Sequence, residues 1–417
     1  MHPGANWLIK NVRLLLPDRI QAESSVLICN GQIDQICANQ VHPKSPPSNL
    51  NILDGQGALL TPGLIDLHTH GIENYLYEAS PSDLLSGMQA QSKYGVTSIL
   101  PTIYRLFSKD KLHKISGLAA TLKANHHYSP GFHFEGPFLA LPGAGAETVP
   151  GDIVLLKEII AAADGTLKAM SISPDTKNII PIIETLKDYE ISVFMTHTQA
   201  TTTQTQTAIQ AGAHHATHFY NVFYPPEETE PGVRPVGIVE EILADKDTTV
   251  DFICDGTHVH SSAIKAAIAA KSTEQVALIT DSNIGAGLDE GIYEIPAWNM
   301  TIQTRHNNAA RIHAPNTKQH GSLAGSTLTM NKGMQNLFKW IDLPESQIWQ
   351  MGTSTPANII QMKNKGRIVV GADADLVLWN PDHHNLQPDF TWLQGKLTYH
   401  SDSQSYLIQQ NTNKITQ

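Results

Sequence analysis

The chain has 417 residues, of which 41% are hydrophobic, and its formal net charge is -11. This composition supports a large core, in the range of one large α/β barrel or two domains. The negative charge and the absence of basic runs argue against nucleic acid or an anionic membrane surface as a partner. Three cysteines without CxxC spacing argue against a disulfide framework and a thiolate zinc site. No leader pattern and no membrane-length apolar run is visible, so we expect a cytoplasmic protein.

Residues 6–60 have the pattern of short strands separated by turns. Three apolar runs, 7–14, 25–28 and 32–36, are typical of strands, and Asn30-Gly31 is a hairpin signal between the last two. The stretch 42–48, rich in Pro and Ser, is expected to be a loop. Strand-like runs return over 366–371 and 374–379. We therefore predict one small β-sandwich domain built from both chain ends, residues 1–60 and 365–417.

From residue 61 onward, apolar runs alternate with helical stretches. Eight strand-then-helix units predict a (β/α)8 TIM barrel over residues 61–364, with its active site where the strands end. An excursion over 288–321 follows the eighth strand, and we expect a hairpin there. The candidate strands are 64–70, 96–102, 131–136, 167–174, 191–197, 214–221, 249–258 and 275–282.

The first candidate strand ends in His68-Thr69-His70-Gly71. Residues two apart on a strand face the same way, so both imidazoles can point at one metal ion. Taken alone, a His-x-His pair more often consists of two ordinary core or surface histidines. Its place at the end of a buried strand, before a glycine, favours the metal-binding interpretation.

Other strand ends carry residues of the same kind. Glu135 ends the third candidate strand, His197 the fifth, His218 lies at the end of the sixth, and Asp281 near that of the eighth. On one rim of one barrel these side chains would form a cluster suited to one or two divalent ions, with zinc expected first and iron, manganese or cobalt as alternatives.

Such a cluster predicts hydrolysis of an amide, ester or amidine carbon, or a deamination. A metal with an open position lowers the pKa of its water to about 7 and polarises a carbonyl oxygen. Asp281 is placed to act as general base on that water and then as general acid. Neither a GxxxxGK[ST] phosphate loop nor a Gly-x-Ser-x-Gly elbow occurs in the sequence.

Several motifs, in the same order along nearly the whole chain, resemble the amidohydrolase superfamily and, within it, the branch of N-acetylglucosamine-6-phosphate deacetylases. The Glu-Gly-Pro-Phe and Leu-Ala-Gly-Ser segments are specific to this branch, since many other amidohydrolases use a carboxylated lysine in place of Glu135. The matching segments are 62–71, 133–138, 216–221, 255–259, 279–281, 323–330, 355–357 and 371–376.

The resemblance implies a role for each residue of the cluster. It implies that Glu135, His197 and His218 hold the primary metal and that His68 and His70 complete a second site. Asp281 would be the catalytic acid and base. The implied substrate is an amino-sugar phosphate, N-acetylglucosamine 6-phosphate, which would be deacetylated to glucosamine 6-phosphate and acetate.

The resemblance also implies substrate contacts and a homodimer. His258 and Asn221 would contact the sugar phosphate, assisted by the backbone around Phe219 and Tyr220. Arg234 roughly matches an arginine that reaches the phosphate across the dimer interface; the alternative is a solvated loop charge.

Three departures from the branch concern the substrate. A histidine that helps polarise the acetyl carbonyl is absent around Gly145, an acidic insert occupies 227–230, and Ser282-Asn283-Ile284 follows Asp281 where relatives usually carry Ala. The metal set is intact. Two alternatives therefore stay open: hydrolysis of a related N-acyl amide (N-acetylgalactosamine 6-phosphate, an unphosphorylated amino sugar or an N-acyl amino acid), or a non-catalytic barrel.

Overall fold

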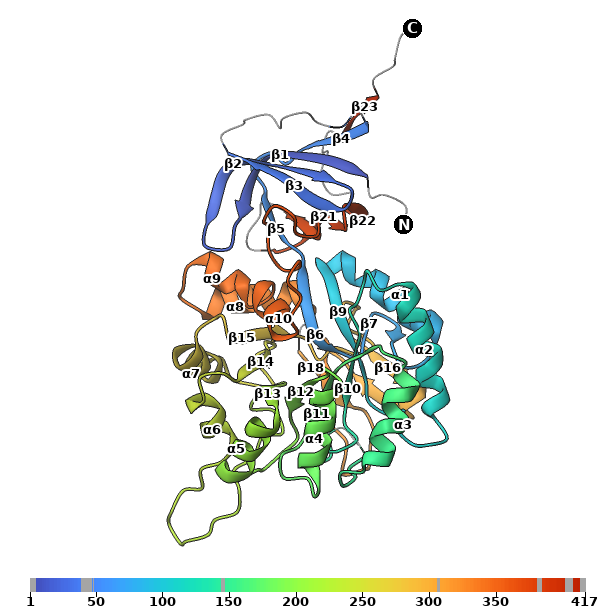
Figure 1. The fold of residues 1–417 in the computed structure, drawn as a ribbon, viewed down its shortest axis with the longest axis vertical. Helices are drawn as coiled ribbons and strands as arrows, with labels where there is room; N and C mark the ends of the chain where they lie inside the picture. Colours follow the sequence, from blue (N-terminus) through green and yellow to red (C-terminus); the bar gives the residue numbers. More distant parts are fainter. Residues whose placement is uncertain are drawn as a thin grey trace. The chain divides into compact units, whose positions relative to one another are not determined.

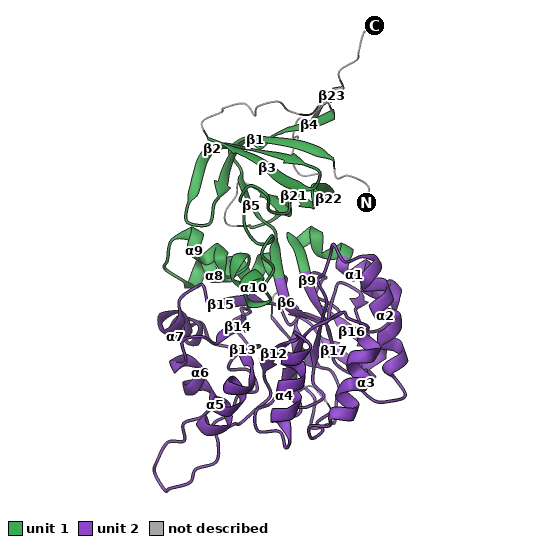
Figure 2. Ribbon diagram, viewed as in Figure 1, with its two compact units in different colours: residues 1–65, 89–98, 330–417 green, residues 66–88, 99–329 purple. Residues whose placement is uncertain are grey.

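The structure, a computed structural model, describes residues 5–38, 47, 49–143, 147–305, 308–380, 385–401 and 408–412. The chain forms two compact units (Figure 2). Unit 1 comprises Met1–Ile65, Gln89–Ser98 and Met330–Gln417, and unit 2 comprises Asp66–Met88 and Ile99–Thr329. The predicted domain boundaries at residues 60 and 364 stay a prediction. The loop predicted at 42–48 and the segment around Gly145 lie outside the described residues, apart from position 47 in the former.

The predicted barrel is confirmed. Eight strands of the described chain follow one another in a single sheet in the order β15-β14-β13-β12-β11-β10-β9-β6 (Figure 1). Neighbouring strands from β9 to β15 pair in parallel. The strands are β6 (Leu64–Thr69), β9 (Val96–Ile103), β10 (Phe132–Glu135), β11 (Leu167–Ile172), β12 (Ser192–Met195), β13 (Ala213–Ala216), β14 (Thr249–Ile253) and β15 (Val276–Ile279). Most are shorter at their C-terminal ends than predicted, because the polar residues there leave the ladder and form turns.

Amphipathic helices follow the strands, as the alternation predicts, and lie outside them (Figure 1). Helix α3 buries Leu156, Ile159 and Ala163 on one face, and Asp152 caps its start by accepting two backbone N–H groups. The helices are α1 (Pro81–Ala90), η1 (Gln91–Tyr94), α2 (Leu112–Ala124), α3 (Ile153–Ala163), α4 (Ile179–Asp188), α5 (Thr202–Ala211), α6 (Ile238–Ala244) and α7 (Ser261–Lys271). No described helix is both long and apolar enough to cross a membrane.

Hydrogen bonds beyond the end of β15 tie it to β6. The Asp281 N–H donates to the His68 carbonyl at 2.9 Å, and the His70 N–H donates to the Ser282 carbonyl at 2.8 Å. The buried carboxyl of Asp66 accepts from the Thr280 hydroxyl at 2.5 Å and from the His68 backbone N–H at 3.2 Å. This closure fixes the first and last strand ends next to each other.

The excursion after β15 is larger than the predicted hairpin. It forms a four-stranded antiparallel sheet of β16 (Ile292–Ile295), β17 (Met300–Gln303), β18 (Ala309–Ile312) and β19 (Leu323–Ser326), with the short helix η2 (Pro296–Trp298) after β16. Its apolar cluster includes Ile295, Trp298 and Ile302 together with Tyr104 from the barrel. His306 and Asn307, within this excursion, lie outside the described residues.

Unit 1 contains a separate mixed sheet from both chain ends, as predicted. Seven strands run in the order β22-β21-β20-β5-β1-β2-β3, and β4 pairs with β1 and β23. Strands from the two ends lie side by side where Leu60 of β5 faces Leu378 of β20. The bounds are β1 (Asn6–Leu15), β2 (Ile20–Cys29), β3 (Gln32–Cys37), β4 (Asn49–Asp54), β5 (Leu59–Pro62), β20 (Leu376–Trp379), β21 (Pro388–Leu393), β22 (Lys396–His400) and β23 (Ile408–Thr412).

One strand prediction in unit 1 is wrong. Residues 366–371 do not form a strand. Gly366 and Gly371 adopt positive φ angles of 72° and 86°, which break an extended run. The helices of this unit are α8 (Met330–Trp340), α9 (Glu345–Gln350) and α10 (Ser354–Ile359). Cys29, Cys37 and Cys254 are free thiols, in keeping with the sequence.

The Asp66→Asn variant tests the barrel closure. Burial raises the pKa of Asp66 to about 7, whereas the unfolded chain releases this proton near about 3.9. Folding therefore takes up a proton between these pH values, and this contribution to stability falls as pH rises, by at most about 4 kcal/mol. Asparagine mimics the protonated carboxyl. We expect the metal-free variant to gain stability relative to wild type between about pH 5 and about pH 8, measured by urea unfolding. A pH-independent difference would contradict the prediction.

Candidate metal centre and active site

A pocket of about 540 Å³ lies where the barrel strands end. Residues from several strand ends and from the four-stranded insert line it, among them Glu135, Asp281, His258, Tyr104 and Trp298. Because these side chains come from separate elements, the closed barrel is what brings them into one cavity.

The carboxylate of Glu135 lies between two pairs of imidazoles. Its Oε1 is 3.0 Å from Nε2 of His197 and 3.3 Å from Nε2 of His218. Its Oε2 is 3.3 Å from Nε2 of His70 and 3.8 Å from Nε2 of His68. All five residues are buried. One carboxylate therefore faces four ring nitrogens, two from each side.

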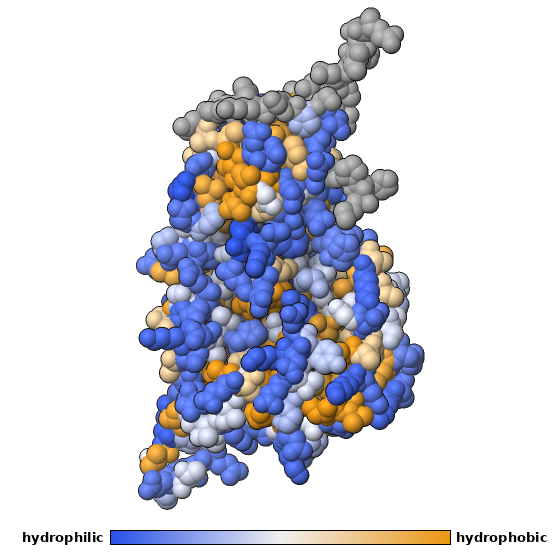
Figure 3. Space-filling view, in the orientation of Figure 1, coloured by the Kyte–Doolittle hydropathy of each residue, from blue (hydrophilic) through white to orange (hydrophobic). Residues whose placement is uncertain are grey.

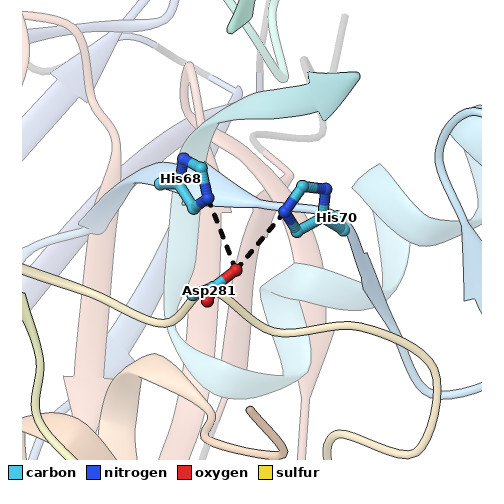
Figure 4. Close-up of side chains that lie close together, drawn as sticks. All are labelled: His68, His70 and Asp281. Atoms are coloured by element: carbon cyan, nitrogen blue, oxygen red, sulfur yellow. Dashed lines mark ion pairs between the residues drawn. The ribbon is translucent and has the colours of Figure 1, made fainter. Parts of the chain in front are cut away.

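Asp281 completes the cluster on the side of β6. Its Oδ1 lies 3.4 Å from Nε2 of His68 and 3.3 Å from Nε2 of His70, so both imidazoles point at one carboxylate oxygen (Figure 4). Two groups have the spacing to hold an ion: His68, His70 and Asp281, and His68, Glu135 and His218. The structure thus brings together all six residues that the sequence placed at strand ends.

Three of these residues have an uncommon backbone conformation just past their strands. His197, His218 and Asp281 have φ angles of 49°, 37° and 49°. A left-handed conformation costs a non-glycine residue roughly 1–3 kcal/mol and persists only where neighbouring groups hold it. The His218 N–H donates to the buried Asp251 carboxylate at 2.5 Å. Each of these turns directs its side chain into the pocket.

Hydrogen bonds on the far side of two rings select the tautomer that a metal needs. The Nδ1–H of His197 donates to the Leu141 carbonyl, and the Nδ1–H of His218 donates to the Asn221 carbonyl, both at 3.2 Å. A carbonyl only accepts, so Nδ1 carries the proton and Nε2 faces Glu135. In the neutral ring, Nε2 would then present its lone pair to a metal ion, which is the arrangement usual for metal-binding histidines.

The remaining two histidines support the same conclusion. Nδ1 of His68 lies 3.1 Å from Nδ1 of His133, and its Nε2 points to the Asp281 and Glu135 carboxylates, at 3.4 and 3.8 Å. Nε2 of His70 points to the same two carboxylates, at 3.3 Å from each. The donor set of imidazole nitrogens and carboxylate oxygens suits zinc and similar divalent ions. The residues present therefore fit a divalent metal.

The protonation equilibria of the cluster reflect its mixed charges. Burial alone would raise the pKa of Glu135, but the histidines, His197 foremost, hold it well below its usual range. Burial likewise opposes ionisation of Asp281, yet hydrogen bonds to His68 and His70 lower its pKa. Burial lowers the pKa of His70, but its bonds to Asp281 and Glu135 raise it to about 10. The two carboxylates are therefore anionic at neutral pH, and the cluster favours bound positive charge.

Of the predicted substrate contacts, two line the pocket. Asn221 and His258 do so, and Nδ1 of His258 lies 2.7 Å from the buried Asp255 carboxylate. Phe219 is fully buried in contact with other aromatic rings and does not line the pocket, and neither does Tyr220. The Phe219 N–H donates to the Asp251 carbonyl.

The structure does not bring Arg234 into the pocket of its own chain. Its side chain is 80% exposed and pairs with Glu240 at 2.6 Å. It lies on the long loop between β13 and α6, which extends away from the barrel (Figure 1). Glu227, Glu228 and Glu230 of the acidic insert are exposed on the same loop, and none of them lines the pocket.

Sequence reasoning missed several residues of the pocket wall. Tyr104 follows directly after β9, so the strand-end rule that found Glu135 could have found it. Trp298 lies in the insert, where no periodic signal marks it. Gly143 approaches the ring of His197 so closely that a Cβ there would lie 2.2 Å from its Cε1. Asn283 was noted as a departure, but its place in the pocket was not foreseen.

A barrel with histidines and carboxylates at its strand ends is the arrangement expected of an amidohydrolase, and comparison with known proteins gives the same family. The amidohydrolase family matches residues 59–398, and the chain belongs to this family. It is 30% identical over 391 residues to the N-acetylglucosamine-6-phosphate deacetylase of Bacillus subtilis (strain 168), covering 90% of this chain and 93% of that protein. It is 26% identical over 366 residues to the N-acetylgalactosamine-6-phosphate deacetylase of Escherichia coli O157:H7, covering 84% and 90%.

Solved structures share the fold. The N-acetyl-D-glucosamine-6-phosphate deacetylase of Mycobacterium smegmatis, in complex with N-acetyl-D-glucosamine-6-phosphate, superposes with a TM-score of 0.82 at 24% identity, over 95% of this chain and all (100%) of that one. The Thermotoga maritima N-acetylglucosamine-6-phosphate deacetylase gives 0.78 at 23% identity, over 94% and 100%.

The Gly143→Ala variant tests the close approach to His197. The added methyl group must displace the ring, because its nearest contact would be 2.2 Å. We expect metal affinity to fall about 10- to 100-fold, the usual cost of disturbing a ligand's support, measured by competition with a chelator. Gly117→Ala is the matched control, since its nearest neighbour would lie at 4.0 Å. Equal affinity of the two variants would contradict the prediction.

Proposed function

We propose that the protein hydrolyses the acetamide of N-acetylglucosamine 6-phosphate, giving glucosamine 6-phosphate and acetate. The observation that carries this proposal is the convergence of four histidines and two carboxylates in one buried pocket. The family membership and the 30% identity to the Bacillus subtilis deacetylase support the substrate.

We assign the proposed metal-binding residues to the two sides of the Glu135 carboxylate. Glu135, His197 and His218 would hold the primary ion, and His68 and His70 would complete a second site beside Asp281. One or two ions fit this arrangement, with zinc first and iron, manganese or cobalt as alternatives. A divalent ion held here supplies an acidic water and polarises the acyl carbonyl.

Asp281 is the proposed acid and base. Its lowered pKa leaves it ionised at neutral pH, so it can take a proton from the attacking water. It then delivers this proton to the amine as the carbon–nitrogen bond breaks. Its backbone is held on both sides, by the His68 carbonyl and by the Ser326 N–H at 2.8 Å, which fixes the carboxylate in the pocket.

The sugar phosphate is proposed to lie against His258 and Asn221. The bond from Nδ1 of His258 to Asp255 leaves Nε2 to contact the substrate. The backbone around Phe219 and Tyr220 would hold the turn that carries Asn221, and so would position Asn221 toward the substrate.

Arg234 is proposed to act in a homodimer, on the phosphate bound by the partner chain. The loop that carries it also exposes Tyr224, Val233 and Val236, at 55%, 53% and 50%. Figure 3 shows hydrophobic surface towards the end of this loop, on an otherwise mainly hydrophilic part of unit 2. Exposed apolar groups beside a cation on a protruding loop suit a protein interface better than solvent.

The first test measures amine release by metal-loaded protein. We expect turnover of N-acetylglucosamine 6-phosphate to exceed that of N-acetylgalactosamine 6-phosphate and of unphosphorylated N-acetylglucosamine. The Asp281→Asn variant should retain its metal and lose about 10²- to 10⁴-fold in kcat, the usual contribution of a general acid–base group. Chelation should abolish turnover and zinc should restore it. No turnover of the phosphorylated sugars by metal-loaded wild type would refute the proposal.

The Arg234→Ala variant tests the phosphate contact. A charge-assisted hydrogen bond of about 1.5–3 kcal/mol predicts a KM increase of about 10- to 100-fold for the phosphorylated substrate. The KM for unphosphorylated N-acetylglucosamine should not change. Arg19→Ala, which removes an exposed arginine of unit 1, is the control. An unchanged KM would assign Arg234 to a solvated loop charge.

A further inference from the structure

Tyr104 presents a polar group that the metal centre and the proposed sugar contacts leave unexplained. It follows β9, lines the pocket and is 6% exposed. Its phenolic oxygen is buried beside the Arg105 guanidinium, which can only donate to it, and no acceptor for its O–H proton lies within hydrogen-bond distance among the described residues. A buried O–H group normally finds an acceptor, because leaving it without one costs about 1–3 kcal/mol. A ligand in the pocket would supply the missing acceptor.

The ring of Tyr104 lies against the proposed metal centre. It packs edge-on against His70 with ring centroids 5.6 Å apart, and against Trp298 at 5.5 Å. Trp298 in turn packs edge-on against His70 at 5.4 Å. Burial, and after it the negative charge of Glu135, raise the pKa of Tyr104, so the hydroxyl keeps its proton. Tyr104 therefore lines the same pocket as Glu135 and Asp281, with its ring against His70.

One buried carboxylate fixes this arrangement. Glu78 accepts the Tyr104 N–H at 2.7 Å through Oε2 and the indole N–H of Trp298 at 2.6 Å through Oε1. Arg105 donates to the Trp298 carbonyl at 2.7 Å. The two rings are thus held in place before any substrate enters, which is the condition for an effective hydrogen-bond donor in catalysis.

We infer that Tyr104 is a catalytic residue whose hydroxyl donates a hydrogen bond to the acyl oxygen of the substrate. This inference rests on the proposed deacetylase function and adds a residue to it. Amide hydrolysis builds negative charge on that oxygen. A fixed hydrogen-bond donor at this position stabilises the charge and lowers the activation free energy of the hydrolysis. No histidine occurs between positions 134 and 196, the stretch from the third barrel strand to the fifth, that could donate this hydrogen bond instead.

The step balances without proton loss from Tyr104. The water oxygen bonds to the carbonyl carbon, the π electron pair moves onto the acyl oxygen, and one water proton passes to Asp281. The electron pair then reforms the carbonyl as the carbon–nitrogen bond breaks, and the nitrogen takes the proton from Asp281. The second water hydrogen leaves with acetic acid, which ionises in solution. Tyr104 keeps its proton and only strengthens its hydrogen bond.

The Tyr104→Phe variant removes only the hydroxyl and keeps the ring against His70 and Trp298. Single-turnover rates isolate the chemical step. We expect a loss of about 10²-fold on N-acetylglucosamine 6-phosphate, as for other oxyanion donors, with metal content and KM unchanged. The loss should shrink several-fold on the N-trifluoroacetyl analogue, whose fluorines already stabilise the oxyanion. Tyr189→Phe, at an exposed tyrosine, is the matched control.

The outcomes separate this inference from the proposed function. A wild-type protein that deacetylates the sugar phosphate, with Tyr104→Phe equally fast, would overturn only the role of Tyr104. Equal losses on both acyl groups, or a loss of metal, would also overturn it, since they indicate a structural role. A wild type without deacetylase activity would refute the proposed function, and the inference with it.

Discussion

The Glu135 carboxylate, buried between four imidazoles, is the constraint on which the pocket depends. Burying an ionised carboxylate is costly unless positive charge and hydrogen bonds compensate for it. The four imidazoles supply part of that compensation, because they hold the pKa of Glu135 well below its usual range. A divalent ion bound here would add positive charge against the same carboxylate, so its binding would be coupled to the stability of this region.

The turns that follow the barrel strands position the residues around Glu135. His197, His218 and Asp281 hold left-handed backbone conformations, each just beyond a strand end. The Asp251 carboxylate supports the turn at His218, and the bonds between the ends of β6 and β15 support the turn at Asp281. Strained turns at the rim are sustained by a well-packed interior, so precise placement of ligands depends on residues that never touch the metal.

The insert after β15 forms one wall of the pocket. Glu78, from the barrel, fixes the Trp298 indole of the insert, and Trp298 packs beside Tyr104 and His70. The wall is mostly aromatic near the centre, whereas His258 and Asn221 offer polar atoms elsewhere in the pocket. This division suits a substrate with a small apolar acyl group and a polar sugar.

Local sequence patterns were enough to predict the barrel and its six-residue cluster, because strand period and strand-end position are local properties that closure of a parallel sheet converts into one rim. They also indicated the separate sheet from both chain ends. They could not decide that residues 366–371 leave the sheet, that the excursion forms four strands, or that Phe219 is buried away from the pocket. Tyr104 and Trp298 share the Glu78 carboxylate as a hydrogen-bond acceptor, although it lies 26 and 220 residues from them along the chain. Such contacts depend on long-range packing, which no local pattern encodes, so they are found only in the folded chain.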